Sequence, residues 1–184
     1  FAEAVLKIIP TAIVGVSTVG GAFNQQGIEN MSLVNERPII FPYSNPTSHS
    51  ECTAEQAYTW SKGKAIFASG SPFAPVTYEG KTYTPGQGNN VFIFPALGMA
   101  IFATEAKRVT DDMLLIAAEA VAEQVTATDF ENGLIYPHVN NILNVSMNVA
   151  VRIAEHIFDS GLAGISRPEN IRAFVKSKMY LPKY

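Results

Sequence analysis

Small polar residues follow three apolar runs of this sequence, at positions where binding side chains would be most useful. They occupy residues 17–21, 44–47 and 69–72. If the runs before them are parallel strands, these segments face one crevice, because ligands of open α/β sheets bind at the carboxyl ends of the strands. Asn45 precedes Pro46, which favours an extended backbone and so directs the amide. An Asx turn that ends the strand explains Asn45 equally well.

The segment GQGNN, residues 86–90, combines two glycines with paired side-chain amides. Glycine allows positive φ angles and a close approach of the backbone to a ligand. Asn89 and Asn90 stand where the apolar run 91–103 begins, and the free N–H groups of a helix starting there would favour a carboxylate or a phosphate. A helix cap needs only one of the two asparagines, so the second amide favours a binding role.

The sequence contains no recognisable motif for acid–base or nucleophilic catalysis. The acidic residues at 111–112 and at 119 and 123 have the spacing of a capped, solvated helix face. One cysteine and three scattered histidines cannot form a zinc cluster. Those histidines, which also stand outside any recognisable catalytic loop, are His49, His138 and His156.

Short apolar runs alternate with helical patterns in the first half of the chain, which predicts parallel strands joined by helices. Thr53 and Gln56 form a capping box at the start of one of these helices, and Glu79-Gly80 indicates a hairpin within 77–86. The segment 15–21, GVSTVGG, lacks the G-x-G-x-x-G spacing of a dinucleotide-binding fingerprint. The predicted strands are 12–17, 38–45 and 65–70, and the predicted helices are 1–8, 24–34 and 53–63.

The second half of the chain is predicted to be helical and to add no strand. These helices should cover a face of the sheet or pack against a segment outside this sequence. They are expected from Asn89 or Asn90 to Ala103, over 110–125, over 146–161 and over 168–180.

Composition excludes several classes of protein. A net charge of −3 gives no basic patch for nucleic acid or an anionic membrane. The longest apolar run, 91–103, is shorter than a membrane span and contains Pro95 and Gly98. A single cysteine, Cys52, allows no internal disulfide and fits a reducing intracellular compartment. The first residues have neither Met nor a signal-peptide pattern, which indicates a piece of a longer protein.

Four motifs, in this order, resemble the C-terminal part of the malic enzymes: SNPT (44–47), ECTAEQAY (51–58), FASGSPF (67–73) and PGQGNN (85–90). The similarity runs nearly from end to end. It implies an α/β fold, namely the second half of a Rossmann-type parallel-sheet domain with C-terminal helices. We expect the Rossmann-type part in residues 1–145 and the C-terminal helices in residues 146–184.

Malic enzymes oxidise (S)-malate with NAD or NADP and a divalent metal, Mg²⁺ or Mn²⁺, and release pyruvate and CO₂. The resemblance implies substrate contacts for Asn45, Asn89 and Asn90, with Asn90 at the malate carboxylate. It implies cofactor contacts for Val16, Ser17, Asn45 and Asn89. The family is usually dimeric or tetrameric, so a homo-oligomer is expected, and the cytosol and the mitochondrion stay open as compartments.

The family's catalytic Tyr and Lys, substrate-binding Arg, acidic metal ligands and glycine-rich phosphate loop stand upstream of this region. We therefore assign no catalytic residue and no metal ligand here, and we expect this chain to be inactive by itself. Two departures bear on the site. Pro42 and Tyr43 replace small or apolar residues, and the turn 15–21 replaces one richer in Ala and Gly.

A different class of function is also compatible with the scaffold. A non-catalytic nucleotide-binding or interaction domain could keep it, and the upstream sequence would distinguish the two: a phosphate loop and acidic ligands there favour the enzyme. An unrelated dinucleotide-dependent dehydrogenase does not explain the four motifs in this order.

Overall fold

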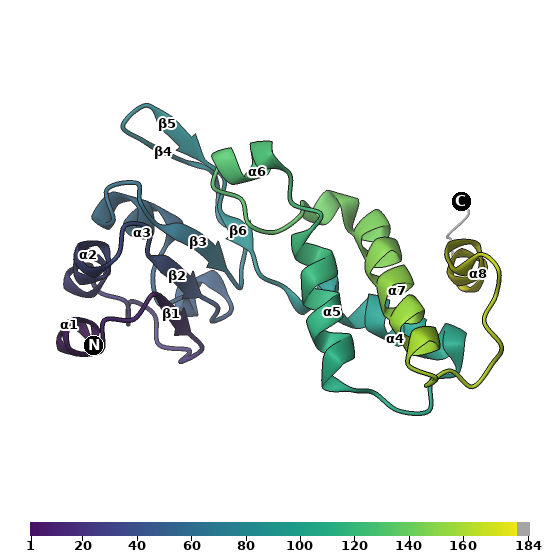
Figure 1. Ribbon diagram of the computed structural model, residues 1–184. Helices are drawn as coiled ribbons and strands as arrows, with labels where there is room; N and C mark the ends of the chain where they lie inside the picture. The colour runs from purple at the N-terminus through teal and green to yellow at the C-terminus, as the bar shows by residue number, and fades with distance from the viewer. Residues whose placement is uncertain (180–184) are drawn as a thin grey trace. The chain divides into compact units, whose positions relative to one another are not determined.

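The computed structural model describes residues 1–179. The chain forms two compact units (Figure 1). Unit 1 comprises Phe1–Asn89 and Val125–Tyr136, and unit 2 comprises Asn90–Gln124 and the residues from Pro137 onward. The chain therefore passes from unit 1 to unit 2 within the GQGNN segment.

Unit 1 is built on a four-stranded parallel sheet in the order β1-β2-β3-β6. Its strands are β1 (Ala12–Gly15), β2 (Ile39–Pro42), β3 (Ile66–Ser69) and β6 (Gly86–Gln87). The predicted α/β class with a parallel sheet is confirmed. The predicted strands β1, β2 and β3 are present but shorter than predicted, and β6, with no strand pattern of its own, was not predicted.

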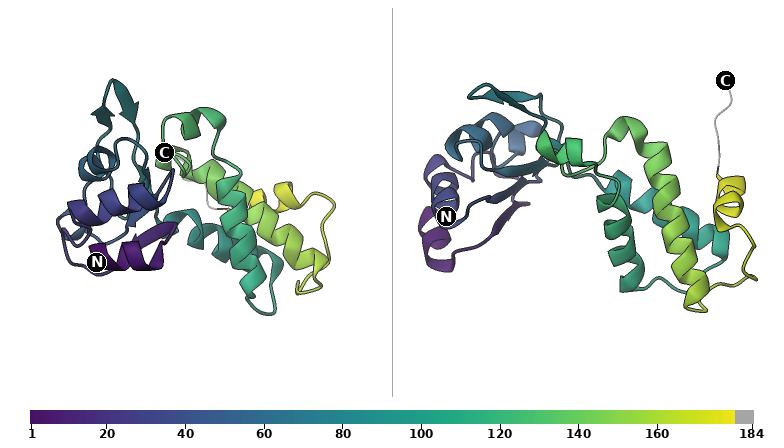
Figure 2. Two further views of the ribbon diagram at one scale, coloured as in Figure 1. Left: turned by 60° about the vertical axis from the view of Figure 1, so that its left-hand side comes forward. Right: turned by 45° about the horizontal axis from the view of Figure 1, so that its top comes forward.

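Three helices complete the core of unit 1: α1 (Ala2–Ile8), α2 (Gln25–Val34) and α3 (Ala54–Trp60). Helices α1 and α2 lie side by side (Figure 2). Alternation along the strands turns Ile13 and Ile40 into the core, where they meet buried Ile28 and Tyr58. The capping box predicted for α3 is confirmed, and a short 3₁₀ turn, η1 (Thr47–His49), connects β2 toward it.

A hairpin projects from this unit. It consists of β4 (Val76–Tyr78) and β5 (Lys81–Tyr83), paired antiparallel. Glu79 and Gly80 both have positive φ, 49° and 79°, so the predicted hairpin turn is confirmed. Tyr83 stacks on Tyr58 with ring centroids 4.5 Å apart, which anchors the hairpin to the core.

The late segment Val125–Tyr136 also belongs to unit 1. It contains α6 (Ala127–Glu131), which begins with its own capping box of Thr126 and Asp129. The Asn132 carbonyl accepts a hydrogen bond from the backbone N–H of Thr84, at 2.8 Å, and so joins this segment to the end of β5.

Unit 2 is helical. It contains η2 (Asn90–Phe92), α4 (Phe94–Thr104), α5 (Asp111–Ala122), η3 (Val139–Asn141), α7 (Ile142–Asp159) and α8 (Ile171–Lys178). Helix α7 lies beside α4 and α5 (Figures 1 and 2) and also contacts α8. Val145, Val149, Ile153 and Ile157 are buried at the spacing of one helix face, which makes α7 the centre of this unit.

Several predicted boundaries differ from the structure. The helix expected from Asn89 or Asn90 begins at Phe94, and the last helix begins at Ile171 with Asn170 as its cap. Of the predicted helix 168–180, Tyr180 lies outside the described residues. The expected domain division at residue 145 does not coincide with the two units, because that residue lies in the first turn of α7. Among residues 1–179, no helix is both long and apolar enough to cross a membrane.

Candidate functional site

The carboxyl ends of the four parallel strands share one edge of the unit 1 sheet. The residues that follow them include Val16 and Ser17 after β1, Asn45 after β2 and Asn89 after β6. This edge therefore holds four of the five residues proposed from the sequence for binding. The fifth, Asn90, is the first residue of unit 2.

A buried carboxylate, Glu51, ties the ends of β1 and β2 together. One of its oxygens, Oε1, accepts hydrogen bonds from the Ser17 backbone N–H (2.8 Å), the Ser17 hydroxyl (2.8 Å) and the Ser44 hydroxyl (2.6 Å). Burial acts to raise the pKa of Glu51, but the hydrogen bonds from Ser44 and Ser17 outweigh it, so the pKa is lower than usual. The carboxylate is therefore ionised near neutral pH and fixes the shape of this edge.

Gly15 is what allows the carboxylate to lie against β1. A Cβ atom built on Gly15 would be 2.4 Å from Cδ of Glu51, far closer than van der Waals contact. A side chain at residue 15 and a carboxylate at residue 51 are therefore mutually exclusive in this arrangement.

The two proposed cofactor residues of the turn after β1, Val16 and Ser17, differ in their contacts. The Ser17 hydroxyl donates to Glu51 and accepts from the Val19 backbone N–H at 3.2 Å, so it already shapes the turn. Val16 is 75% exposed at the edge. Thr18 has a positive φ of 59°, and its N–H donates to the Ser44 hydroxyl at 2.8 Å.

The Asn45 amide is exposed and held in place by its neighbours. Its Oδ1 accepts a hydrogen bond from the Ser71 hydroxyl, and its Nδ2 donates to the Tyr43 carbonyl at 3.4 Å. The peptide bond between Asn45 and Pro46 is cis. Gly70 permits this packing, because a Cβ there would be 2.2 Å from the Tyr43 carbonyl oxygen.

The GQGNN segment is fixed to β3 before it leaves the sheet. The Gly88 N–H donates to the Ser69 carbonyl at 2.9 Å, and the Gln87 side-chain amide donates to the Gly70 carbonyl at 3.3 Å. Asn89 follows directly and is half-buried.

Asn90 does not cap a helix, contrary to the prediction. It begins the 3₁₀ turn η2, in which its carbonyl accepts from the Ile93 N–H at 3.0 Å, and Ile93 is the residue that precedes α4. The reason is Pro95, which lacks an N–H and is tolerated only in the first turn of a helix. The helix start predicted at Asn89 or Asn90 is therefore wrong, and anion binding by these two amides stays a prediction that no longer draws on a helix N-terminus. The exposed Asn90 side chain makes no hydrogen bond within residues 1–179.

Sequence reasoning missed Glu51 at this edge and noted Tyr43 only as a departure from the family pattern, without a contact to the loops. Glu51 is an isolated acid in ECTAEQAY, directly before the buried Cys52. That neighbourhood was the available signal, because a carboxylate beside core residues must have hydrogen-bond donors around it.

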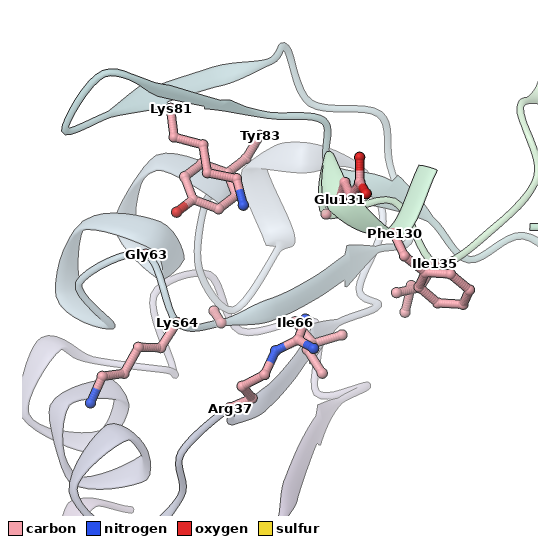
Figure 3. A pocket seen from close by; sticks show the side chains of 11 residues that line it. Arg37, Gly63, Lys64, Ile66, Lys81, Tyr83, Phe130, Glu131 and Ile135 are labelled. Atoms are coloured by element: carbon pink, nitrogen blue, oxygen red, sulfur yellow. The ribbon is translucent and has the colours of Figure 1, made fainter. Parts of the chain in front are cut away.

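A cavity of about 520 Å³ lies elsewhere in unit 1, at the amino ends of β2 and β3 (Figure 3). Arg37, Lys64 and Ile66 line it from those strands and the residues before them, and Lys81 and Tyr83 reach it from the hairpin. None of the proposed binding residues lines it, so it is separate from the edge described above. Among the described residues, no group of three or more His, Cys, Asp or Glu side chains could hold a metal ion.

Comparison with known proteins gives a consistent result. Residues 1–158 match the family described as malic enzyme, NAD binding domain. The chain is 54% identical to the chloroplastic NADP-dependent malic enzyme of Flaveria pringlei, covering 100% of this chain and 29% of that protein. It is 50% identical to the NADP-dependent malic enzyme of Dictyostelium discoideum, covering 99% of this chain and 34% of that protein.

Solved structures agree on the fold. A malic enzyme from Pyrococcus horikoshii Ot3 aligns with a TM-score of 0.68 at 25% identity, covering 91% of this chain and 34% of that one. The Entamoeba histolytica enzyme aligns with a TM-score of 0.74 at 21% identity, covering 96% and 33%. The chain thus spans about a third of the length of the proteins it matches.

Proposed function

Because this chain belongs to the malic enzyme family, we propose that it forms the second half of the NAD(P)-binding domain, with the closing helices, of a complete malic enzyme. That enzyme converts (S)-malate to pyruvate and CO₂ with NAD or NADP and a divalent metal. The NADP dependence named for the plant and Dictyostelium relatives favours NADP. We expect the complete enzyme to be a dimer or tetramer.

The observation that carries the proposal is the edge where β1, β2, β3 and β6 end. The family match over residues 1–158 spans every strand of this edge and all five proposed binding residues. We assign substrate binding to Asn45, Asn89 and Asn90, and cofactor contacts to Val16, Ser17, Asn45 and Asn89. Amides and hydroxyls suit the ribose hydroxyls and carboxamide of the cofactor, because they both donate and accept hydrogen bonds.

In this proposal the chain positions reactants and leaves proton transfer to residues outside it. Bound NAD(P) supplies the hydride acceptor. Neutral amides orient malate by hydrogen bonds without adding charge beside the atom that loses hydride. The described residues do not fit the divalent metal, since they bring no three suitable ligands together, and we derive no step through it.

The proposal is tested in the complete enzyme by steady-state kinetics with malate, Mn²⁺ and either cofactor, following both reduced cofactor and pyruvate. Replacing the exposed amide, Asn90→Ala, should raise KM for malate and lower kcat on the order of 10-fold, because a hydrogen bond to a carboxylate is worth about 1.5–3 kcal/mol. Asn140→Ala, at an exposed asparagine of η3, is the matched control and should change neither constant. A complete enzyme that makes no pyruvate overturns the function, and normal kinetics of Asn90→Ala overturn the role of that residue.

A further inference from the structure

Tyr43 is the first residue after β2, and it contacts both of the loops that carry proposed binding amides within unit 1. Its ring stacks on Phe41 with centroids 5.3 Å apart. Neither the family match nor the proposed set of binding residues gives Tyr43 a role.

On one side, the ring fills the space beside Gly88. A Cβ atom built on Gly88 would be 2.6 Å from Cε1 of Tyr43 and 2.9 Å from its hydroxyl oxygen. Gly88 also donates its N–H to Ser69 at 2.9 Å. The residue directly before Asn89 is therefore held between the end of β3 and the hydroxyl end of the Tyr43 ring.

On the other side, the backbone of Tyr43 holds Asn45. Its carbonyl accepts from the Asn45 amide at 3.4 Å, while the Ser71 hydroxyl holds the oxygen of that amide. A displacement of Tyr43 would therefore move the contacts of Asn45 and of Gly88 together.

The far end of the side chain is fixed as well. The hydroxyls of Tyr43 and Tyr136 are hydrogen-bonded at 2.9 Å. Burial, and then the hydrogen bond with Tyr136, raises the pKa of the Tyr43 phenol well above its usual value. The Tyr43 phenol is therefore neutral near neutral pH.

We propose that Tyr43 is a positioning residue that sets the separation between the amides of Asn45 and Asn89, and that the hydroxyl of Tyr136 holds its ring against Gly88. The inference rests on the proposed function, because it concerns the alignment of malate and the cofactor. Its physical basis is that a displaced amide makes a longer and weaker hydrogen bond to its ligand even when the amide itself remains, so the affinity for malate falls.

The test uses the complete enzyme with Tyr43→Phe, Tyr136→Phe and the double substitution. Each single change removes the bond between the hydroxyls and leaves both rings. We expect KM for malate to rise about 3- to 10-fold in each, as for the loss of one ordinary hydrogen bond, and the double variant to be no worse than the singles. Tyr43→Leu, which also removes the ring, should lower kcat/KM further. Tyr78→Phe in β4 removes a tyrosine hydroxyl elsewhere in unit 1 and should leave KM unchanged.

A second measurement needs no turnover. Hydrogen–deuterium exchange at the Gly88 amide, which is bonded to Ser69, should be faster in Tyr43→Phe and Tyr136→Phe than in the wild type. A purely structural role would lower thermal stability and the active fraction, and hence kcat, while KM for malate and Gly88 exchange stay at wild-type values; that result overturns the inference. If the wild type itself makes no pyruvate, the proposed function fails instead, and unchanged Gly88 exchange would remove the positioning role independently.

Discussion

Glu51 is the residue on which the shape of the proposed binding edge depends most. Its carboxylate is buried, ionised and bonded to both Ser17 and Ser44. Removing a buried charge leaves its hydrogen-bond donors without an acceptor, and this lowers the stability of the folded state. The same side chain therefore links the local turn after β1 to the stability of unit 1.

Glu51→Gln should lower the free energy of unfolding by about 1–3 kcal/mol. The amide would place an NH₂ group where a carboxylate oxygen now accepts from the Ser44 N–H at 3.4 Å. Chemical denaturation of the complete enzyme at neutral pH measures the loss. Glu55→Gln, at an exposed acid in the first turn of α3, is the control and should change stability by only a few tenths of a kcal/mol. Equal stability of the two variants would contradict the role given to Glu51.

The same comparison has a defined pH dependence. The pKa of Glu51 is lower in the folded state than its ordinary value of 4.5, so its contribution is complete above that value and disappears as the pH falls through the folded pKa. The stability difference between wild type and Glu51→Gln should therefore shrink below about pH 4.5. A difference that stayed constant between neutral and strongly acidic pH would show that the carboxylate is not stabilised by these bonds.

Among the elements, α3 shows how local sequence fixes a helix that the site needs. Thr53 Oγ1 accepts from the Gln56 N–H at 3.1 Å, and the Gln56 side chain accepts from the Thr53 N–H at 2.9 Å. The N-cap Thr53 is two residues after Glu51, so the capping box also limits where that carboxylate can lie.

Thr53→Ala should cost about 0.5–2 kcal/mol of stability through loss of the cap. Thr59→Ala, at an exposed position of the same helix, removes the same side-chain atoms at a residue that caps nothing, so it serves as the reference. Thermal or denaturant unfolding of the complete enzyme distinguishes them. If both variants lost the same stability, the effect would belong to helix composition and not to the cap.

Elements with a local signal were predictable from the sequence, and those set by distant partners were not. Strands β1, β2 and β3, the α3 cap and the turn at Glu79-Gly80 each have their pattern in adjacent residues. Strand β6 is two residues long and exists only because β3 pairs with it. The start of α4 could have been placed from Pro95, but the paired asparagines favoured an earlier cap.

The same distinction holds for the site. The topology rule placed Ser17 and Asn45 at the carboxyl ends of parallel strands, which the sheet order bears out. Their hydrogen-bond partners were out of reach, because Glu51 is 34 residues from Ser17 and Tyr136 is 93 residues from Tyr43. Such pairs leave no periodic or motif signal. The binding roles of Val16, Ser17, Asn45, Asn89 and Asn90 stay predictions.

For the molecule as a whole, β1 is an outer strand of the sheet, and the side of it that faces away from β2 has no strand partner within residues 1–179. Within residues 1–179, β1 pairs only with β2, and Val14 on β1 is 56% exposed. An unpaired strand edge with apolar side chains promotes pairing between chains.

We therefore expect the 184-residue chain, produced by itself, to self-associate, and Val14→Lys to increase the monomer fraction. Size-exclusion chromatography with light scattering measures this. Leu33→Lys places the same charge on an exposed position of α2, away from any strand, and should have a smaller effect. Equal effects of the two lysines would assign the association to net charge and not to the strand edge.

Unit 1 is made of two segments that are separated in the sequence, and this affects the order in which it can fold during synthesis. A nascent chain that ended at Asn89 would already contain all four parallel strands. It would still lack Asn132, which bonds to Thr84, and Tyr136, which bonds to Tyr43. Helices α4 and α5 must therefore emerge before unit 1 is complete. The proposed binding edge is consequently finished late in synthesis, by a segment of twelve residues, Val125–Tyr136, that the ribosome releases after most of the sheet has formed.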